Sequence, residues 1–386
     1  MDGFVGKSMN KVAIVISNDH YNALGVVRSL GCSKIYVILI LFSEGLTYVD
    51  KSKYVNEAIK VSGFDEVSAH ICKISCRFQN CFIFPLSDSS AEYIDRNYSS
   101  FPQNVYAPHM FGRMPFYQNK WNAKQLAQKI GMNVAIDCIE NPKESDKSLW
   151  NIFPCIIKPL VSLNGRKSDI QTVWSSAAYS TALKCFEKKK YENVLVEQFL
   201  CGKSEYMIEV VGASTSTEVF IAGIIRKIRE YPIINGSTSY AWVEMKSSVI
   251  DIELVKKYIL ETHYIGLFDM EFKYVDGKVY FIECNFRNGA PSYIFTRLNV
   301  NIPVAWINAM SSPLYNFCNR NEYSKCYFMC EQTDIMNMLK RKIGAFPWIR
   351  DFFRAKKIFV SIADLKPLVS YIFLMVSIFF EKLRNR

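Results

Sequence analysis

Two carboxylates and one amide mark the stretch of sequence whose residue types could do chemistry. Glu271 lies in one strand-like run, and Glu283 and Asn285 lie in the next, two residues apart and so on one face of a strand. Burying carboxylates is costly because each loses its hydration, and a hard cation offsets that cost. Magnesium takes oxygen ligands, usually one or two carboxylates together with substrate phosphates. The spacing predicts a magnesium site, with an exposed polar strand face as the alternative.

The turn between the two runs decides whether the carboxylates can meet. It contains the Asp-Gly pair 276–277. A two-residue turn would place Glu271 opposite Ile282 and point it away from Glu283. A three-residue loop with a G1 bulge would place Glu271 opposite Phe281, on the face of Glu283. We therefore expect convergence only in the second register.

A lysine at the end of an apolar strand is a further candidate. Lys158 closes the run FPCIIKP, where a lone cation needs an anionic partner, and a phosphate would serve. Downstream, Glu197 precedes a short edge segment, 198–200, whose backbone could recognise a purine. Glu205 could accept hydrogen bonds from ribose hydroxyl groups. These residues predict a nucleotide site.

A small doubly wound α/β lobe is expected before these candidates. Residues 11–17 and 35–41 are apolar runs typical of buried strands, and 22–30 between them has a helical pattern. Another strand is expected at 81–85, followed by a helix. The lobe lacks GxGxxG after its first strand, so we assign no dinucleotide to it. We expect residues 1–112 to shape one wall of a cleft.

The candidate residues themselves fall in a second region, residues 113–312. Its alternating and apolar runs predict a chain of mixed α/β and α+β class. The expected elements are a helix at 120–130, strands at 153–159, 193–199, 205–211, 218–228 and 238–246, a helix at 251–263 and a hairpin at 267–285.

Composition indicates a folded chain of several lobes. The chain has 386 residues, more than one core of ~250–300 residues usually holds. Its 50% hydrophobic and 22% charged residues argue against disorder. The net charge of +11 is spread out and no nucleic-acid-binding signature accompanies it, so we expect no nucleic-acid partner. The twelve cysteines include no CxxC pair, which is typical of reduced thiols in a cytoplasmic protein.

These motifs together resemble those of the ATP-grasp superfamily. The matching stretches are NKWNAKQLAQKIGM, the strand with IIKP, VEQFLCGKSEY, LFDMEF and YFIECNFRNG, in the family's order and within residues 119–303. The Glu-x-Asn-x-Arg motif after an upstream glutamate is quite specific. The residues of these motifs are most similar to those of the carbamoyl-phosphate-synthase-like and amino-acid ligase branches. The resemblance implies an ATP-grasp fold preceded by the small doubly wound lobe.

The resemblance also implies roles for the candidates. Lys120 and Lys158 would contact ATP phosphates, and Glu205 would hold the ribose. Arg287 would steady the reacting phosphoryl group or acyl phosphate. The residues that would hold adenine are Glu197, Gln198, Phe199 and Leu200. The residues that would bind one or two magnesium ions, with manganese possible, are Glu271, Glu283 and Asn285.

Two loops would complete such a site. The family's phosphate-covering loop is usually glycine-rich, whereas residues 160–169 contain only Gly165, so we expect other residues to help. Those residues are Ser162, Asn164, Arg166 and Lys167. The loop 226–240 carries Arg226, Lys227 and Arg229, and would face the γ-phosphate and the substrate carboxylate, with a solvated charge run as the alternative.

The resemblance implies an ATP-dependent carboxylate–amine ligase. Most members of the superfamily transfer the γ-phosphoryl group to a carboxylate and let an amine displace phosphate. Small-molecule carboxylate and amine substrates are the expected partners, and the sequence does not name them. One alternative is a phosphotransferase that uses the same fold without forming an amide. Another is a non-catalytic nucleotide-binding module that recruits partners to a membrane.

The last region, residues 313–386, is basic and ends in an apolar tail. Seven lysines and arginines between 340 and 357 precede the 14-residue run 367–380. As a helix this run would reach ~21 Å, short of the ~30 Å hydrocarbon core, so a span is not expected. We expect either burial against the protein or an oligomer partner, or peripheral contact with the inner face of the membrane.

Overall fold

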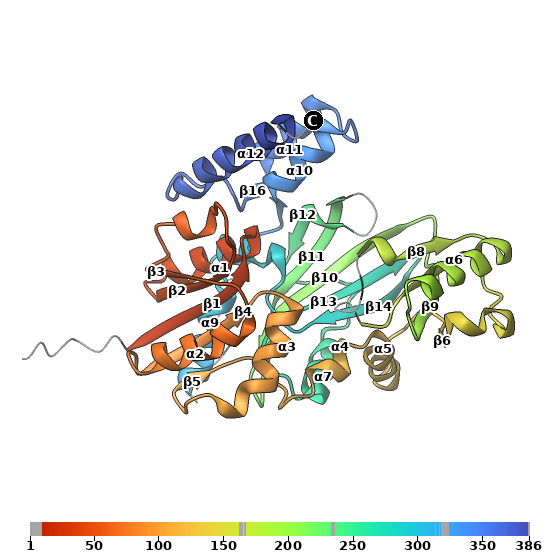
Figure 1. The fold of residues 1–386 in the computed structure, drawn as a ribbon, viewed down its shortest axis with the longest axis horizontal. Coiled ribbons are helices and arrows are strands. Elements are labelled where there is room, and N and C mark those ends of the chain that lie inside the picture. The colour runs from red at the N-terminus through yellow and green to blue at the C-terminus, as the bar shows by residue number, and fades with distance from the viewer. Residues whose placement is uncertain are drawn as a thin grey trace, which may run out of the picture.

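The computed structural model describes residues 10–161, 165, 167–232, 236–312, 314, 315, 317 and 324–384. Its strands form three sheets, and helices cover their faces (Figure 1). Parallel and antiparallel sheets occur in one chain, which confirms the predicted mixture of α/β and α+β structure.

The first lobe is a parallel sheet in the order β3-β2-β1-β4-β5. Alternate residues of β1 point to opposite faces, and both faces are buried, one against α1 and the other against α2 and α3. The predicted strands and helix are confirmed, whereas β3 and α2 were not expected because β3 is a polar edge strand. The elements are β1 (Lys11–Asn18), α1 (Tyr21–Gly31), β2 (Tyr36–Phe42), β3 (Glu57–Val61), α2 (Phe64–Ser75), β4 (Asn80–Pro85), α3 (Asp88–Asn97) and β5 (Val105–Tyr106).

A small four-stranded sheet follows, in the order β6-β9-β7-β8. Its strands pair antiparallel, and α6 covers one face through Leu183 and Phe186. The elements up to the end of this sheet are α4 (Met114–Gln118), α5 (Lys120–Lys129), β6 (Asp137–Glu140), β7 (Cys155–Pro159), β8 (Gln171–Val173), α6 (Ser176–Lys188) and β9 (Val194–Gln198).

The largest sheet has seven strands in the order β14-β13-β10-β11-β12-β15-β16. Its first five strands come from the predicted second region, and the last two come from beyond residue 313. The remaining elements are β10 (Glu205–Ser214), β11 (Val219–Tyr231), β12 (Ser237–Glu244), α7 (Ile252–Thr262), β13 (Gly266–Val275), β14 (Lys278–Asn285), α8 (Tyr293–Thr296), α9 (Ile302–Ser311), β15 (Cys326–Met329), α10 (Glu331–Leu339), α11 (Ala345–Arg354), β16 (Lys356–Lys357) and α12 (Lys366–Arg384).

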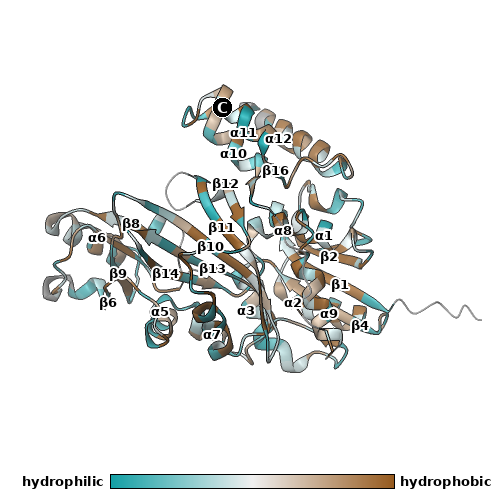
Figure 2. Ribbon diagram, turned by 180° about the vertical axis from the view of Figure 1, so that it is seen from behind, coloured by the Kyte–Doolittle hydropathy of each residue, from teal (hydrophilic) through white to brown (hydrophobic). Residues whose placement is uncertain are grey.

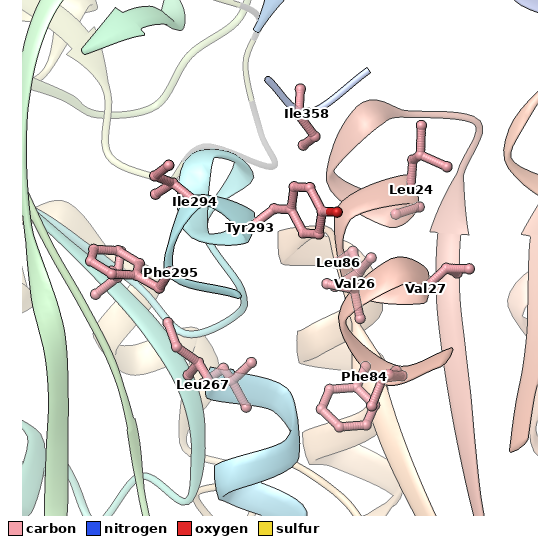
Figure 3. Packing of buried hydrophobic residues seen from close by; sticks show 14 of the residues in the cluster. Leu24, Val26, Val27, Phe84, Leu86, Leu267, Tyr293, Ile294, Phe295 and Ile358 are labelled. Carbon is pink, nitrogen blue, oxygen red and sulfur yellow. The ribbon is translucent and has the colours of Figure 1, made fainter. Parts of the chain in front are cut away.

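One hydrophobic core joins the first lobe to the large sheet (Figure 3). Leu24 of α1 and Phe84 of β4 belong to the same buried cluster as Leu267 of β13 and Tyr293 of α8. The helices α1 and α8 approach closely, since a Cβ at Gly25 would lie 2.9 Å from the Cβ of Tyr293. The first lobe is therefore held firmly against the sheet that carries the candidate metal ligands.

The C-terminal region is folded onto both other parts. Beyond its two strands in the large sheet, it is held to α1 by a buried ion pair, with Arg28 Nε 2.8 Å from Asp364 Oδ2. The helix α12 packs against the first lobe, where Tyr371 contacts the ring of Tyr48, and Tyr371 also contacts Phe359 of the C-terminal region itself. Among the helices that the structure describes, none is long and apolar enough to cross a membrane.

Candidate active site

A β-bulge in β14 sets the register of the candidate metal ligands. The turn is a two-residue turn, with Asp276 and Gly277 both at positive φ (43° and 94°), as such hairpins require. Phe272 lies opposite Phe281, but the preceding residue of β13 does not lie opposite Ile282. Ile282 is therefore the extra, unpaired residue of β14. Bulges of this kind re-aim side chains next to active sites.

The bulge places Glu271 directly opposite Glu283, on one face of the sheet. The two carboxylates do share a face, but neither register expected from the turn is present. Glu271 lies opposite neither Ile282 nor Phe281, because the extra residue sits inside β14 and not in the loop. Asn285 lies opposite Asp269 on the same face.

The neighbouring strand adds an acidic residue that sequence reasoning missed. Glu209 of β10 lies opposite Glu271, so a row of three glutamates crosses β10, β13 and β14. Asp269 was also missed, although its position two residues before Glu271 places it on the same face. The period-two pattern of LFDMEF was the signal that could have found it.

Two of these carboxylates are buried with an oxygen left unsatisfied. Among the residues that the structure describes, Glu209 Oε2 and Asp269 Oδ1 have no hydrogen-bond partner, and Thr238 donates to the other oxygen of Glu209. Burial, with the nearby Glu209 and Glu271, raises the pKa of Asp269 well above its ordinary value. An added cation would relieve this repulsion, so the oxygen-rich set fits a hard divalent metal.

The protein alone does not enclose such an ion. Within the described part of the chain, no three acidic, histidine or cysteine side chains are grouped closely enough to hold a metal by themselves. Magnesium usually keeps waters and takes substrate phosphates beside one or two carboxylates. The residues present therefore fit an ion completed by nucleotide oxygens better than a permanent structural metal.

Lys227 of β11 supplies a positive charge beside this row. Burial alone would lower its pKa, but the carboxylates of Glu209, Glu271 and Glu230 outweigh burial and raise it. The Nζ atom lies 3.5 Å from Glu230 Oε2. Lys227 is therefore charged and close to the acidic row, as an anion-binding role requires.

Arg226 does not join Lys227. The structure shows that β11 continues to Tyr231, so 226–240 is not a single loop, and successive side chains point to opposite faces. Arg226 stacks over Tyr206 on the far face, with its Cζ 3.6 Å from the ring centre. Arg229 forms ion pairs with Asp334 (2.8 Å) and Asp351 (2.7 Å) of the C-terminal region.

Arg287 connects the candidate metal ligand Asn285 to the first lobe. Its Nε donates to Asp88 Oδ1 (2.7 Å) at the start of α3, and its Nη2 donates to Asn285 Oδ1 (3.2 Å). Burial opposes its charge, but Asp88, Asp269 and Glu283 outweigh burial and raise its pKa. The Asn285 oxygen keeps a second lone pair for a metal. Asp88 was not predicted, since no sequence pattern relates it to Arg287.

Lys120 faces the same acidic residues across a small pocket. The pocket lies between α3, α5 and β14, and its lining includes Asp88, Lys120, Glu283 and Asn285. Burial lowers the pKa of Lys120, while the nearby Glu283 opposes that effect. A half-buried ammonium group beside an acidic row is well placed to bind a phosphate that also contacts a metal ion.

Lys158 is not the lone cation expected from the sequence. Its Nζ lies 2.5 Å from Glu197 Oε1, and the other oxygen of Glu197 is 3.0 Å from Lys124 Nζ. Burial would raise the pKa of Glu197, but the two ammonium groups outweigh it and lower the pKa to about 2. Lys124 also pairs with Asp137 at 2.5 Å. Its position one helical turn after Lys120 was the signal for it.

Two backbone amides of the segment expected to hold adenine already donate hydrogen bonds within the protein. The strand β9 is an inner strand and not an edge. The amides of Gln198 and Phe199 donate to the carbonyls of Ile136 (2.8 Å) and Pro154 (3.0 Å). Recognition of a purine through backbone amides would therefore fall to Leu200.

Glu205 lies near the same segment, at the start of β10. Its carboxylate is 3.3 Å from Lys273 Nζ, and that ammonium group lies over the ring of Phe199. Lys273 shares the face of Glu271, so it lies between the acidic row and the residues predicted to hold ribose and adenine. For the phosphate-covering loop, Ser162, Asn164, Arg166 and the Lys167 side chain lie outside the described residues.

Several solved structures have a fold similar to that of this chain. An N5-carboxyaminoimidazole synthetase from Staphylococcus aureus superposes with a TM-score of 0.66 at 13% identity, covering 87% of this chain and 88% of that one. An L-amino acid ligase from Bacillus licheniformis gives 0.62 at 13% identity, covering 84% and 80%. The chain has the ATP-grasp fold.

Sequence comparison agrees with the ATP-grasp assignment over part of the chain. The carbamoyl phosphate synthase large chain of Clostridium botulinum is 26% identical over 184 residues. The match covers 46% of this ATP-grasp chain but only 17% of the relative, so this chain spans a small part of that protein. No protein-family model matches the chain.

Proposed function

We propose that the chain is an ATP-dependent ligase that activates a carboxylate as an acyl phosphate for attack by an amine. The observation that carries this proposal is the pocket in which Lys120, Glu283 and Asn285 meet Asp88, with Arg287 bonded to both Asn285 and Asp88. Residues suited to bind a metal, to bind a phosphate and to stabilise charge thus lie close together, which supports the proposal.

The nucleotide would lie between the small sheet and the large sheet. Lys120 and Lys158 would bind its phosphates, with Leu200 and Phe199 against the base and Glu205 at the ribose. Magnesium, or manganese, would be held by Glu271, Glu283 and Asn285. When bound, such an ion neutralises phosphate charge and orients the γ-phosphoryl group for in-line transfer.

The reaction needs two group transfers. A carboxylate oxygen of the substrate forms a bond to the γ-phosphorus of ATP, the bond from that phosphorus to the bridging oxygen breaks, and ADP leaves. The amine nitrogen then bonds to the acyl carbon, the bond from that carbon to the phosphate oxygen breaks, and phosphate leaves while the nitrogen loses a proton. Arg287 and Lys227 would stabilise the negative charge on the transferring group.

Arg226 has no part in this proposal. It lies on the opposite face of the sheet from Lys227 and stacks on Tyr206. The names of the similar structures, a synthetase and an amino acid ligase, favour ligation over the other uses of the fold.

Phosphate release from ATP tests the proposal. The purified chain should release phosphate only with a suitable carboxylate and amine together, in a screen of amino acids and sugar acids supplied singly and in pairs. Hydroxylamine in place of the amine should trap the acyl phosphate as a hydroxamate. Turnover that yields a stable phosphorylated product without an amine would favour a phosphotransferase. Nucleotide binding without any turnover across the screen would favour a non-catalytic module.

A further inference from the structure

The helix α12 carries apolar side chains on two opposite faces. One face packs against the core of the first lobe through Leu368, Tyr371 and Leu374. The residues of the other face recur at spacings of three and four, so they form a stripe along the helix. They are Val369, Ile372, Phe373 and Val376, exposed at 49%, 53%, 68% and 46%.

The preceding helix, α11, adds a second exposed apolar face. Trp348 and Phe352 pack inward, whereas Phe346 and Phe353 are 88% and 78% exposed. Ile362, in the connection to α12, is 90% exposed. Both helices lie at one end of the molecule (Figure 1), and much of α12 is coloured as hydrophobic in Figure 2. We call this set of residues, with the stripe on α12, the C-terminal apolar surface.

The region that carries this surface is rich in basic residues. Residues 340–386 contain eleven lysines and arginines but three acidic residues. Two of those acids are buried in ion pairs, Asp351 with Arg229 and Asp364 with Arg28. Glu381 is the remaining acid, so the exposed charge of this region is strongly positive.

The charge and shape of the region identify its partner. A second copy placed symmetrically on this surface would bring two strongly basic regions together, which is unfavourable. Phe346 and Ile362 expose most of their side-chain surface, at 88% and 90%, as suits insertion between lipid headgroups. Protruding aromatic and aliphatic residues flanked by lysine and arginine are typical of interfacial binding to anionic lipid. We propose that the C-terminal apolar surface docks the protein on an anionic lipid bilayer.

Vesicle flotation with the full chain tests this docking. The protein should bind vesicles that contain about one third phosphatidylglycerol, and should bind phosphatidylcholine vesicles at least about tenfold more weakly. Binding should fall as salt rises, because screening weakens the contribution of the basic residues. The double variant Ile372→Gln with Phe373→Gln should lose about tenfold or more in binding to the anionic vesicles.

Two further variants make the result specific. Leu149→Gln removes a residue that is 92% exposed in the region of the small sheet, and binding should not change. Lys342→Glu with Lys366→Glu reverses two exposed charges, and binding should fall without any apolar residue being altered. Circular dichroism and the melting temperature should match those of the parent in all three variants, because every altered side chain is exposed.

Three outcomes would overturn the proposal. The first is no binding of the parent chain to anionic vesicles at low salt, and the second is equal binding by the Ile372→Gln, Phe373→Gln variant. The third is that light scattering shows the parent chain to be a dimer and only this variant to be a monomer. That outcome would make the surface an interface between copies. None of these outcomes depends on ATP turnover, so this proposal stands or falls separately from the proposed function.

Discussion

Arg287 Nε lies 2.7 Å from Asp88 Oδ1, although the two residues are 199 positions apart in the chain. Arg287 follows β14 of the large sheet, and Asp88 begins α3 of the first lobe. The first lobe is thus more than a wall of the cleft, because it positions the guanidinium group that also contacts Asn285.

Asp88→Asn should lower the turnover number about tenfold while changing the KM for ATP little. The substitution would remove the charge-assisted hydrogen bond that orients Arg287. Part of the ~1.5–3 kcal/mol of that bond would be lost as transition-state stabilisation. Steady-state phosphate release at varied ATP measures both constants. Glu57→Gln breaks a surface ion pair with Arg77 in the same lobe and should leave both unchanged. An unaltered turnover number in Asp88→Asn would contradict the positioning role.

Glu283→Gln and Asn285→Ala should each abolish phosphate release, with at least about a hundredfold loss, while the fold persists. Both changes remove metal ligands from a partly exposed cleft and leave core packing intact. Phosphate release across a magnesium titration measures the loss of metal binding, and circular dichroism shows whether the fold is intact. A chelator should abolish phosphate release by the parent chain. Glu253→Gln, an exposed change on α7, is the control. Full activity in both variants would refute the metal assignment.

Lys158→Ala should raise the dissociation constant for ATP by about tenfold or more, since a charge-assisted contact of ~1.5–3 kcal/mol is removed. Glu197 would keep its contact with Lys124, so the strand should remain folded. Isothermal calorimetry without a second substrate measures the affinity. If the affinity is unchanged, Lys158 serves Glu197 alone and has no contact with the nucleotide.

Asp269→Asn should stabilise the protein at pH 8 in the presence of a chelator, by about 1 kcal/mol or more. Burial first, and then Glu209 and Glu271, raise the pKa of Asp269 in the folded state. The folded chain therefore holds a proton that the unfolded chain releases, and stability falls as the pH rises from about 4 through the folded pKa. The amide variant has no such proton to lose.

Urea unfolding at pH 5 and pH 8 checks this expectation. The stability difference between Asp269→Asn and the parent should be larger at pH 8 than at pH 5. Asp65→Asn, on the exposed first turn of α2, should show no such difference between the two pH values. A constant difference for Asp269→Asn would mean that the buried carboxyl group does not titrate as inferred.

Local patterns were enough to predict much of the scaffold. The apolar runs at 11–17, 35–41 and 81–85 became β1, β2 and β4, because buried parallel strands need continuous apolar sequence. The hairpin at 267–285 and the two-residue spacing of Glu283 and Asn285 were also readable, since strand periodicity is a local property.

Long-range packing decided the rest of the site. No local rule fixes where a bulge forms, so the extra residue at Ile282, which sets Glu271 opposite Glu283, could only be found in the folded sheet. The same holds for Glu209, which joins the row through pairing with a strand 62 residues away, and for the contact of Asp88 with Arg287. A sequence specifies which side chains share a strand face, but the pairing of distant strands and lobes determines which faces meet.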